Sequence, residues 1–213
     1  MKIKDPVSGL SHLMGLALAV VGVGWLVLHG SRDLGTLLAR ALYGVCLVAL
    51  YAASSVYHLV PASEKSTRRL RLFDHLAIFL LVAGTCTPIF YRAFEGNTRL
   101  VMLGSIWLLA AAGVVFKLTW RGAPRWLYTA LYVAMGWAVA LRWSTVAHAL
   151  PPAAWALVLA GGLTYTAGAL IYAVRRPDPL PDRFGFHEIW HLFVLGGSAL
   201  HYSAIAILSE RVS

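Results

Sequence analysis

The sequence predicts an all-α membrane protein, a bundle of seven transmembrane helices with the N-terminus in the cytosol and the C-terminus outside. Of its 213 residues, 59% are hydrophobic and only 13% are charged, and the mean hydropathy is +0.70. A soluble domain of this length needs more polar surface. Apolar stretches long enough to cross a bilayer recur along the chain, and lysine and arginine fall unequally in the breaks between them.

The predicted helices follow from the apolar stretches, because lipid forces each spanning segment to pair its own backbone groups. The chain starts "MKIK", like a secretory signal, but the apolar run that follows is longer than a signal core and has no small-residue cleavage site. We therefore expect this run to remain as the first span. The seven predicted spans are residues 9–29, 36–60, 72–91, 99–117, 125–143, 153–174 and 187–208.

Short polar segments separate these spans, and they carry turn and interface residues. They read "GSRDLG", "PASEKSTRRLR", "EGNTR", "RGAPR", "HALPP" and "RRPDPLPDRFG". None is long enough to link two domains, so we expect residues 1–213 to form a single seven-transmembrane domain. Cys46 and Cys86 lie within apolar stretches and are predicted to be small core residues, not partners in a disulfide.

The basic residues predict the orientation. One side of the membrane receives Lys2, Lys4, Lys65, Arg68, Arg69, Arg71, Lys117, Arg121, Arg125, Arg175, Arg176 and Arg183. The other side receives Arg32, Arg40, Arg92, Arg99, Arg142 and Arg211. Because cytosolic loops carry the excess of lysine and arginine, the first side is predicted to be cytosolic.

The formal charge of +9 thus follows mainly from topology, helped by anionic lipid. Nucleic acid is not an expected partner, since no recognition module accompanies the charge. Membrane lipids are the expected surroundings.

Polar residues converge at one depth near the predicted cytosolic ends of three spans. The second span ends "YAASSVYHLV", which places His58 near its inner end and Ser54 one turn deeper on the same face. The third begins "RLFDHLAIFL", which places Asp74 in its first turn, and the seventh begins "FHEIWHLF", with His187 and His191 in the same layer. We expect these residues to form one site.

The spacing of the histidines predicts a metal site. His187 and His191 are four residues apart, so both imidazoles project from one helix face, as in helices that grip a single metal ion. His58 is expected to supply a third nitrogen. Three histidines leave the fourth tetrahedral position of zinc open for water, which is typical of catalytic zinc. Asp74 is then placed to hold that water or take its proton, and Ser54 to assist by hydrogen bonding.

Several of these residues have simpler interpretations. Asp74 at a helix start is also a cap or dipole partner, and Ser54 can bond back to its own helix. "HEIWH" fits the HExxH zinc-protease pattern, which makes Glu188 an alternative general base, although a glutamate also suits a helix N-terminus. Ser198 and His201 lie deeper than the layer of the histidines, and we expect them to line a cavity or to bond between helices.

The remaining histidines are predicted to be interfacial. His12, His29 and His148 lie near span ends and His75 points away from Asp74 on a helix, so all four are expected to reach toward the membrane surface. In "GTCTP", residues 84–88, glycine and proline are expected to kink the third span, with threonines satisfying freed backbone groups. The kink either opens a lipid-sized cavity or only serves packing.

The segments "SSVYHL", "FDHLAIFLLVAGTCTPIF" and "HEIWHLFVLGGSALHY" closely resemble the bacterial hemolysin III family, which is related to the progestin and adiponectin receptors and, more widely, to the alkaline ceramidases. The resemblance covers essentially the whole chain and implies seven spans with the N-terminus inside, in the bacterial inner (plasma) membrane. It also implies that His58, His187 and His191 are zinc ligands and that Asp74 and Ser54 lie beside them. The receptor relatives resemble lipid-amide hydrolases, although the chain lacks the long N-terminal region of the animal receptors.

These observations lead to a zinc-dependent hydrolase of a lipid amide or ester as the first hypothesis, with zinc as the cofactor and a ceramide-like lipid as the substrate class. A membrane-lipid sensor or regulator with a purely structural zinc is the second. A pore-forming, haemolytic protein is the third, and it requires polar residues that continue through the bilayer. The dense polar cluster lies on the cytosolic side only, which disfavours the pore.

Overall fold

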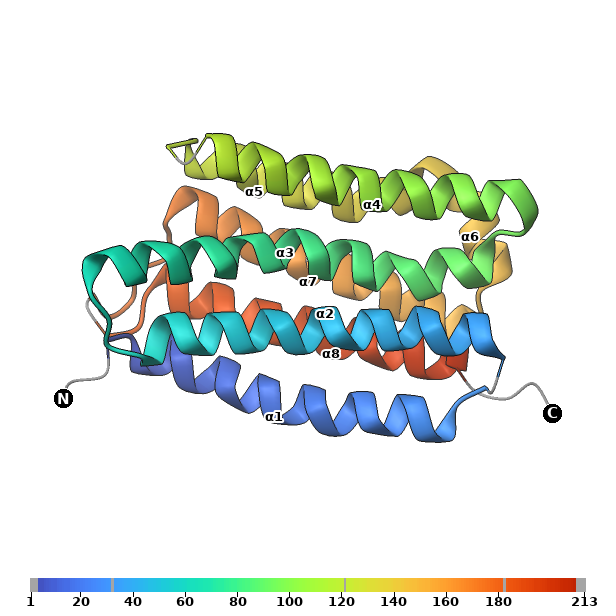
Figure 1. Ribbon diagram of the computed structural model, residues 1–213, viewed down its shortest axis with the longest axis horizontal. Coiled ribbons are helices and arrows are strands. Elements are labelled where there is room, and N and C mark those ends of the chain that lie inside the picture. Colours follow the sequence, from blue (N-terminus) through green and yellow to red (C-terminus); the bar gives the residue numbers. More distant parts are fainter. Residues whose placement is uncertain (1–3, 32, 121, 182, 210–213) are drawn as a thin grey trace.

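A computed structural model describes residues 4–31, 33–120, 122–181 and 183–209, and within them seven segments are long and apolar enough to cross a membrane. Helices form all seven, as predicted (Figure 1). They are α1 (Pro6–His29), α2 (Leu34–Leu59), α3 (Glu64–Ala93), α4 (Gly96–Thr119), the interrupted fifth segment (Arg125–Ala149), α7 (Pro152–Val174) and α8 (Phe186–Ser209).

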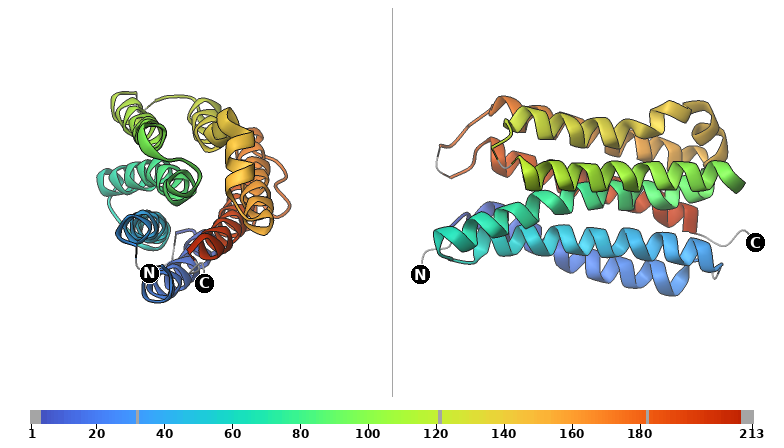
Figure 2. Two further views of the ribbon diagram at one scale, coloured as in Figure 1. Left: turned by 90° about the vertical axis from the view of Figure 1, so that its right-hand side faces the viewer. Right: turned by 45° about the horizontal axis from the view of Figure 1, so that its top comes forward.

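The helices alternate in direction and form a ring when the bundle is viewed from one end (Figure 2). Neighbours in sequence pack side by side, α5 packs on α7, and α8 closes the ring against α1. The third helix is the most buried of the seven and also contacts α5, α6 and α8 across the ring. This arrangement brings α2, α3 and α8, which carry the predicted site residues, around one interior.

Helix α3 begins earlier than predicted. Its first two turns are the charged segment "EKSTRRLR", which the hydropathy pattern assigns to a polar break. Ser63 caps this extension by accepting a hydrogen bond from the Ser66 N–H, and Arg68 pairs with Glu64 one turn away. A helix needs apolar side chains only where lipid surrounds it, so charged turns continue it past the apolar stretch. Asp74 consequently lies about three turns inside α3, so the prediction that it occupies the first turn is wrong, and the alternative of a helix cap is excluded with it.

The fifth span is broken where a continuous helix was predicted. Helix α5 (Arg125–Gly136) passes into a 3₁₀ segment, η1 (Trp137–Arg142), and then into the short helix α6 (Trp143–Ala149). Gly136 lies at the first junction and, together with Trp137 and Val139, it faces the interior cavity described below. The break therefore shapes the cavity wall, as 3₁₀ interruptions of long helices often do at functional sites.

The "GTCTP" segment lies within the uninterrupted helix α3, where it contributes to helix packing and to the wall of the cavity. A Cβ atom at Gly84 would lie 2.8 Å from the Cβ of Cys46, so the glycine allows α2 and α3 to pack closely. Thr85 and Cys86 line the cavity. The hydroxyls of Thr85 and Thr87 donate to the carbonyls of Leu81 and Ala83. Both cysteines are free and buried, as predicted.

The two ends of the bundle differ in charge. We call the end at which α1 begins the basic end; its described lysines and arginines are Lys4, Lys65, Arg68, Arg69, Arg71, Lys117, Arg125, Arg175, Arg176 and Arg183. The opposite end has Arg40, Arg92, Arg99 and Arg142. Lys2, Arg32, Arg121 and Arg211, which also entered the orientation argument, lie outside the described residues. By the positive-inside rule, this asymmetry predicts a cytosolic basic end.

The start of α2, at the opposite end, is capped by a carboxylate. Asp33 accepts hydrogen bonds from the Thr36 N–H at 2.8 Å and from the Thr36 hydroxyl at 2.9 Å. These contacts, the backbone N–H first, hold the pKa of the Asp33 carboxyl below its ordinary value.

Candidate functional site

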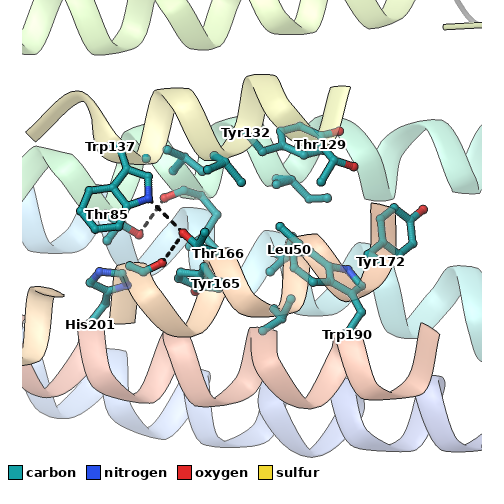
Figure 3. Close-up of a pocket in the computed structure, with 18 of the residues that line it drawn as sticks. Leu50, Thr85, Thr129, Tyr132, Trp137, Tyr165, Thr166, Tyr172, Trp190 and His201 are labelled. Atoms are coloured by element: carbon teal, nitrogen blue, oxygen red, sulfur yellow. Dashed lines mark hydrogen bonds between the residues drawn. The ribbon is translucent and has the colours of Figure 1, made fainter. Parts of the chain in front are cut away.

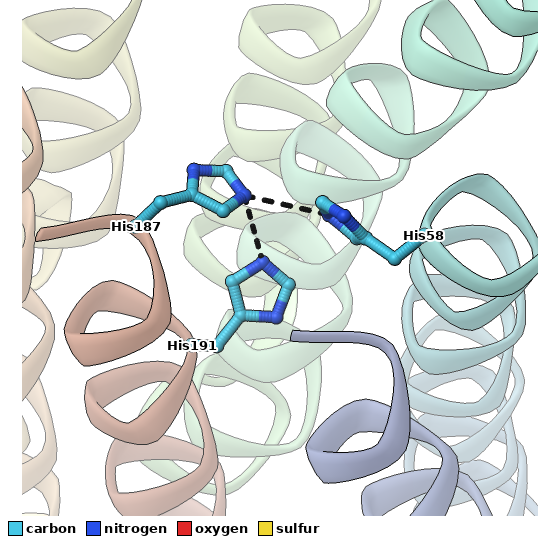
Figure 4. Close-up of side chains that lie close together, drawn as sticks. All are labelled: His58, His187 and His191. Atoms are coloured by element: carbon cyan, nitrogen blue, oxygen red, sulfur yellow. Dashed lines mark hydrogen bonds between the residues drawn. The ribbon is translucent and has the colours of Figure 1, made fainter. Parts of the chain in front are cut away.

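Three histidines meet near the basic end, between α2 and α8. His187 and His191 project from one face of α8, and His58 approaches them from the end of α2 (Figure 4). The Nε2 atom of His187 lies 3.4 Å from Nε2 of His58 and 3.2 Å from Nε2 of His191. His58 and His191 are almost completely buried, and His187 is half-buried. We refer to these three residues as the histidine trio.

The neutral His58 ring carries its proton on Nδ1, so Nε2, the nitrogen that faces the other two histidines, has a free lone pair. The Nδ1 atom of His58 lies 3.0 Å from the Asp5 carboxylate, which can only accept a hydrogen bond, so Nδ1 carries the proton in the neutral ring. The lone pair of Nε2 then points at His187. If His187 Nε2 carries a proton, it can donate a hydrogen bond to Nε2 of either His58 or His191, but not to both. A metal cation, in contrast, can bind all three nitrogens at once.

The spacing of the trio fits a metal ion. With metal–nitrogen bonds of about 2.0–2.1 Å, two ligands of a tetrahedral zinc lie roughly 3.3–3.4 Å apart. The two short nitrogen–nitrogen distances agree with this value, and one ligand atom from each ring lies within 4.8 Å of the others. The predicted trio is therefore arranged so that it could hold a metal ion. Imidazole ligands suit zinc, copper, iron and nickel, so geometry alone leaves the choice of metal open.

Asp74 and Ser54, the two predicted catalytic residues, line the same cavity as His187 and His191. Ser54 is buried, and its Oγ lies 2.8 Å from Nδ1 of His12. Both residues thus share a cavity with two members of the trio. Their catalytic roles remain predictions.

His12 belongs to the site, and its predicted interfacial position is wrong. Only 3% of the residue is exposed, and its ring packs on His191 with 3.9 Å between ring centroids. The ring also contacts Tyr51 edge-on at 5.0 Å. Helix α1 begins at Pro6, so His12 lies almost two turns inside the bundle, at the depth of the trio. His12 therefore lies in the same layer of the bundle as His58, His187 and His191.

An apolar cavity extends from the trio into the bundle (Figure 3). Its volume is about 130 Å³, and α3, α5, α7 and α8 supply most of its walls. Near the trio it is bounded by Tyr172 and Trp190, and farther in by Trp137 and His201. Isolated polar contacts occur in its depth: Trp137 Nε1–H donates to Thr166 Oγ1 at 2.9 Å. His187, His191, Asp74 and Ser54 thus line a mostly apolar chamber.

Glu188 points away from the trio. Its Oε2 accepts a hydrogen bond from the Gly185 N–H at 2.8 Å, which caps the start of α8, and its Oε1 accepts one from the buried Ser8 hydroxyl at 3.0 Å. Glutamate at this position of a helix is a typical capping-box residue. The structure therefore favours the capping interpretation of "HEIWH" over the general-base alternative.

A second, polar cavity of about 360 Å³ lies outside the trio at the basic end. Lys4, Asp5, Asp178, Arg183 and Glu188 are among the residues that line it. His187 lines both cavities, so this imidazole lies between a polar chamber and an apolar one.

The other histidines divide into two groups. His29 and His148 are exposed and bond to the carbonyls of Trp25 and Ser144 in the preceding turns, in agreement with their predicted interfacial positions. His75 instead lines the apolar cavity and packs on Tyr128 with 5.4 Å between centroids, so the interfacial prediction is wrong for it.

The two deeper residues of α8 behave as expected. His201 lines the cavity and stacks on Tyr165, with 5.4 Å between ring centroids. Ser198 bonds to the Tyr165 hydroxyl at 2.8 Å, which links α7 and α8.

Comparison with known proteins agrees with this architecture. Residues 1–202 match the family described as "Haemolysin-III related". The chain belongs to the haemolysin III family. It is 32% identical to "Hemolysin-3" of Bacillus cereus over 201 residues, which cover 93% of the chain and 88% of that protein. It is 28% identical to the "Hemolysin-3 homolog" of Bacillus subtilis (strain 168) over 213 residues, which cover 99% and 97%.

The haemolysin III chain also has eukaryotic relatives. It is 30% identical over 185 residues to the "Heptahelical transmembrane protein ADIPOR2" of Oryza sativa subsp. japonica, covering 79% of the chain and 81% of that protein. This match confirms the expected relation to adiponectin-receptor-type proteins. Together with the seven apolar helices, the bacterial relatives identify a multi-pass membrane protein, consistent with the predicted inner-membrane location.

Proposed function

We propose that this haemolysin III protein is a zinc-dependent hydrolase of a lipid amide or ester that acts at the cytosolic face of the bilayer. One observation carries the proposal: three imidazole nitrogens converge at the end of an apolar cavity that also contains Asp74 and Ser54. His58, His187 and His191 would hold the zinc. When bound there, zinc supplies Lewis acidity, which polarises a carbonyl group and makes water a nucleophile near neutral pH.

The residues of the chain supply the remaining functions. The apolar cavity excludes bulk water and accommodates the hydrocarbon part of the substrate, so that its polar linkage lies beside the trio. The Asp74 carboxylate takes the proton of the attacking water and returns it to the leaving group. Ser54, held by His12, orients the groups around Asp74 by hydrogen bonding. The polar cavity next to His187 offers a path for water and for the polar product.

A non-enzymatic role is the second candidate. The trio joins α2 to α8, which meet at few other places, so a metal bound there would also fasten the bundle. In a lipid sensor or regulator the metal would have only this structural role. A pore is less well supported, because the described cavity is mainly apolar.

Turnover assays separate these functions. Detergent-solubilised protein is incubated with a panel of ceramide-like amides and lipid esters, with zinc and after chelation, and fatty acid release is measured. Hydrolysis that requires zinc and disappears in Asp74→Ala supports the hydrolase. A protein that binds zinc and loses thermal stability without it, but turns over no member of the panel, supports the sensor. Ion flux through reconstituted liposomes would support the pore.

A further inference from the structure

The segment that precedes α1 is attached to one of the proposed metal ligands. The backbone N–H of Asp5 donates to the carbonyl of His58 at 3.2 Å, and the Asp5 carboxylate accepts a hydrogen bond from His58 Nδ1 at 3.0 Å. Both contacts join Asp5 to the same residue, 53 positions away in the sequence. Nδ1 is the ring nitrogen that faces away from the rest of the trio, whose Nε2 atoms converge.

The Asp5 carboxylate is not used by its own helix. Asp5 occupies the N-cap of α1, where an aspartate side chain usually accepts a hydrogen bond from a backbone N–H in the first turn. No such bond forms, Pro6 offers no N–H, and the Gly9 N–H donates to the Asp5 backbone carbonyl instead. The carboxylate is therefore free to bond to His58, and helix capping does not explain its orientation.

The adjacent residue supports the same orientation. The Lys4 ammonium lies 3.7 Å from the Asp5 carboxylate and 4.0 Å from the centre of the Tyr57 ring. Tyr57 is the neighbour of His58 in α2, and the two rings pack with 4.5 Å between centroids. The segment thus lies against the end of α2 through several contacts that surround the two hydrogen bonds between Asp5 and His58.

We propose that Asp5 is a positioning residue that prepares His58 to bind the metal. A carboxylate on the outer nitrogen of a histidine fixes the tautomer, orients the ring and makes the inner nitrogen a stronger donor. The proposal rests on the proposed zinc centre and deepens it by adding a residue that does not contact the metal. It also gives the segment before α1 a function in metal binding.

Zinc affinity is the direct test, because it does not depend on knowing the substrate. Full-length wild type, Asp5→Ala, Asp5→Asn and Glu188→Gln are purified in detergent, and zinc is titrated against a chromophoric chelator. Glu188→Gln is the matched control: its carboxylate also borders the polar cavity but bonds to Ser8 and Gly185, not to a ligand ring.

We expect Asp5→Ala to bind zinc about 10- to 100-fold more weakly than wild type. Asp5→Asn should lose less, because the amide oxygen still accepts from Nδ1–H, and Glu188→Gln should stay within about threefold. The visible spectrum of the cobalt(II)-loaded Asp5→Asn protein should also shift, because a change at the outer nitrogen alters the ligand strength of His58. A purely structural contact would leave that spectrum unchanged.

The outcomes separate the two proposals. Asp5→Ala within about threefold of wild type, or an equal loss in Glu188→Gln, would overturn the role of Asp5 while leaving the zinc centre intact. An unchanged cobalt spectrum in Asp5→Asn would overturn it even if Asp5→Ala folds poorly. A wild-type protein that binds no zinc in this titration would overturn both proposals.

Discussion

Replacement of Glu188 by alanine should destabilise the protein strongly, because two buried donors lose their acceptor. The Ser8 hydroxyl is fully buried and donates to Glu188, and the buried Gly185 N–H donates to the same carboxylate. An unsatisfied buried donor costs about 1–3 kcal/mol, and loss of a helix cap costs about 0.5–2 kcal/mol. Together they should lower the free energy of unfolding by roughly 1.5–5 kcal/mol.

A chain of this length loses about 2–4 °C in its unfolding midpoint per kcal/mol, so we expect Glu188→Ala to unfold roughly 3–20 °C below wild type. Differential scanning fluorimetry in detergent measures this. Glu188→Gln should lose less than half as much, because its amide oxygen still accepts from Gly185 and its amide N–H can donate to Ser8. An unchanged midpoint in Glu188→Ala would refute the capping role. Loss of turnover in a normally stable Glu188→Gln protein would instead identify Glu188 as the general base.

Three further predictions concern the site and the packing around it. Asp74→Ala should lower lipid-amide turnover at least about 100-fold while zinc content stays near that of wild type; retained turnover would exclude Asp74 from proton transfer. Chelation, or acidification that protonates the imidazoles, should remove the metal and with it about 2.7 kcal/mol of stability at a zinc concentration 100 times Kd, and His58→Ala should show no such response. Gly113→Ala should cost about 1–3 kcal/mol in chemical unfolding, because its Cβ would collide with the Phe79 ring. Gly104→Ala, which meets nothing within 4 Å, should be neutral or stabilising, and equal losses in the two variants would contradict the α3–α4 packing.

The histidine trio can be predicted from the sequence because helix periodicity and the alternating direction of the spans are enough to bring its three residues together. The i, i+4 spacing of His187 and His191 fixes a shared helix face, and the alternation of the spans puts His58 at the same depth. The contact between Asp5 and His58 follows from neither rule. It depends on how the segment before α1 lies against the end of α2, and no periodic pattern encodes that path.

Errors at helix ends explain the other differences. Hydropathy detects the part of a helix that lipid surrounds, so it misses the charged first turns of α3 and places Asp74 in the first turn of that helix. The same effect starts the first span at residue 9 and assigns His12 to the interface, whereas α1 begins at Pro6 and buries that ring against His191. The break after Gly136 leaves the overall hydropathy of its span intact, so the apolar pattern alone does not reveal it.

Metal content tests the central claim most directly. Wild-type protein and His191→Ala are purified in detergent without chelators, and their metals are quantified by mass spectrometry together with protein concentration. We predict about one zinc per chain in the wild type and a large loss in the variant, since removal of one of three ligands opens the site. A gently purified wild type without stoichiometric metal, or a variant that keeps its full zinc content, would contradict a metal centre built on His58, His187 and His191.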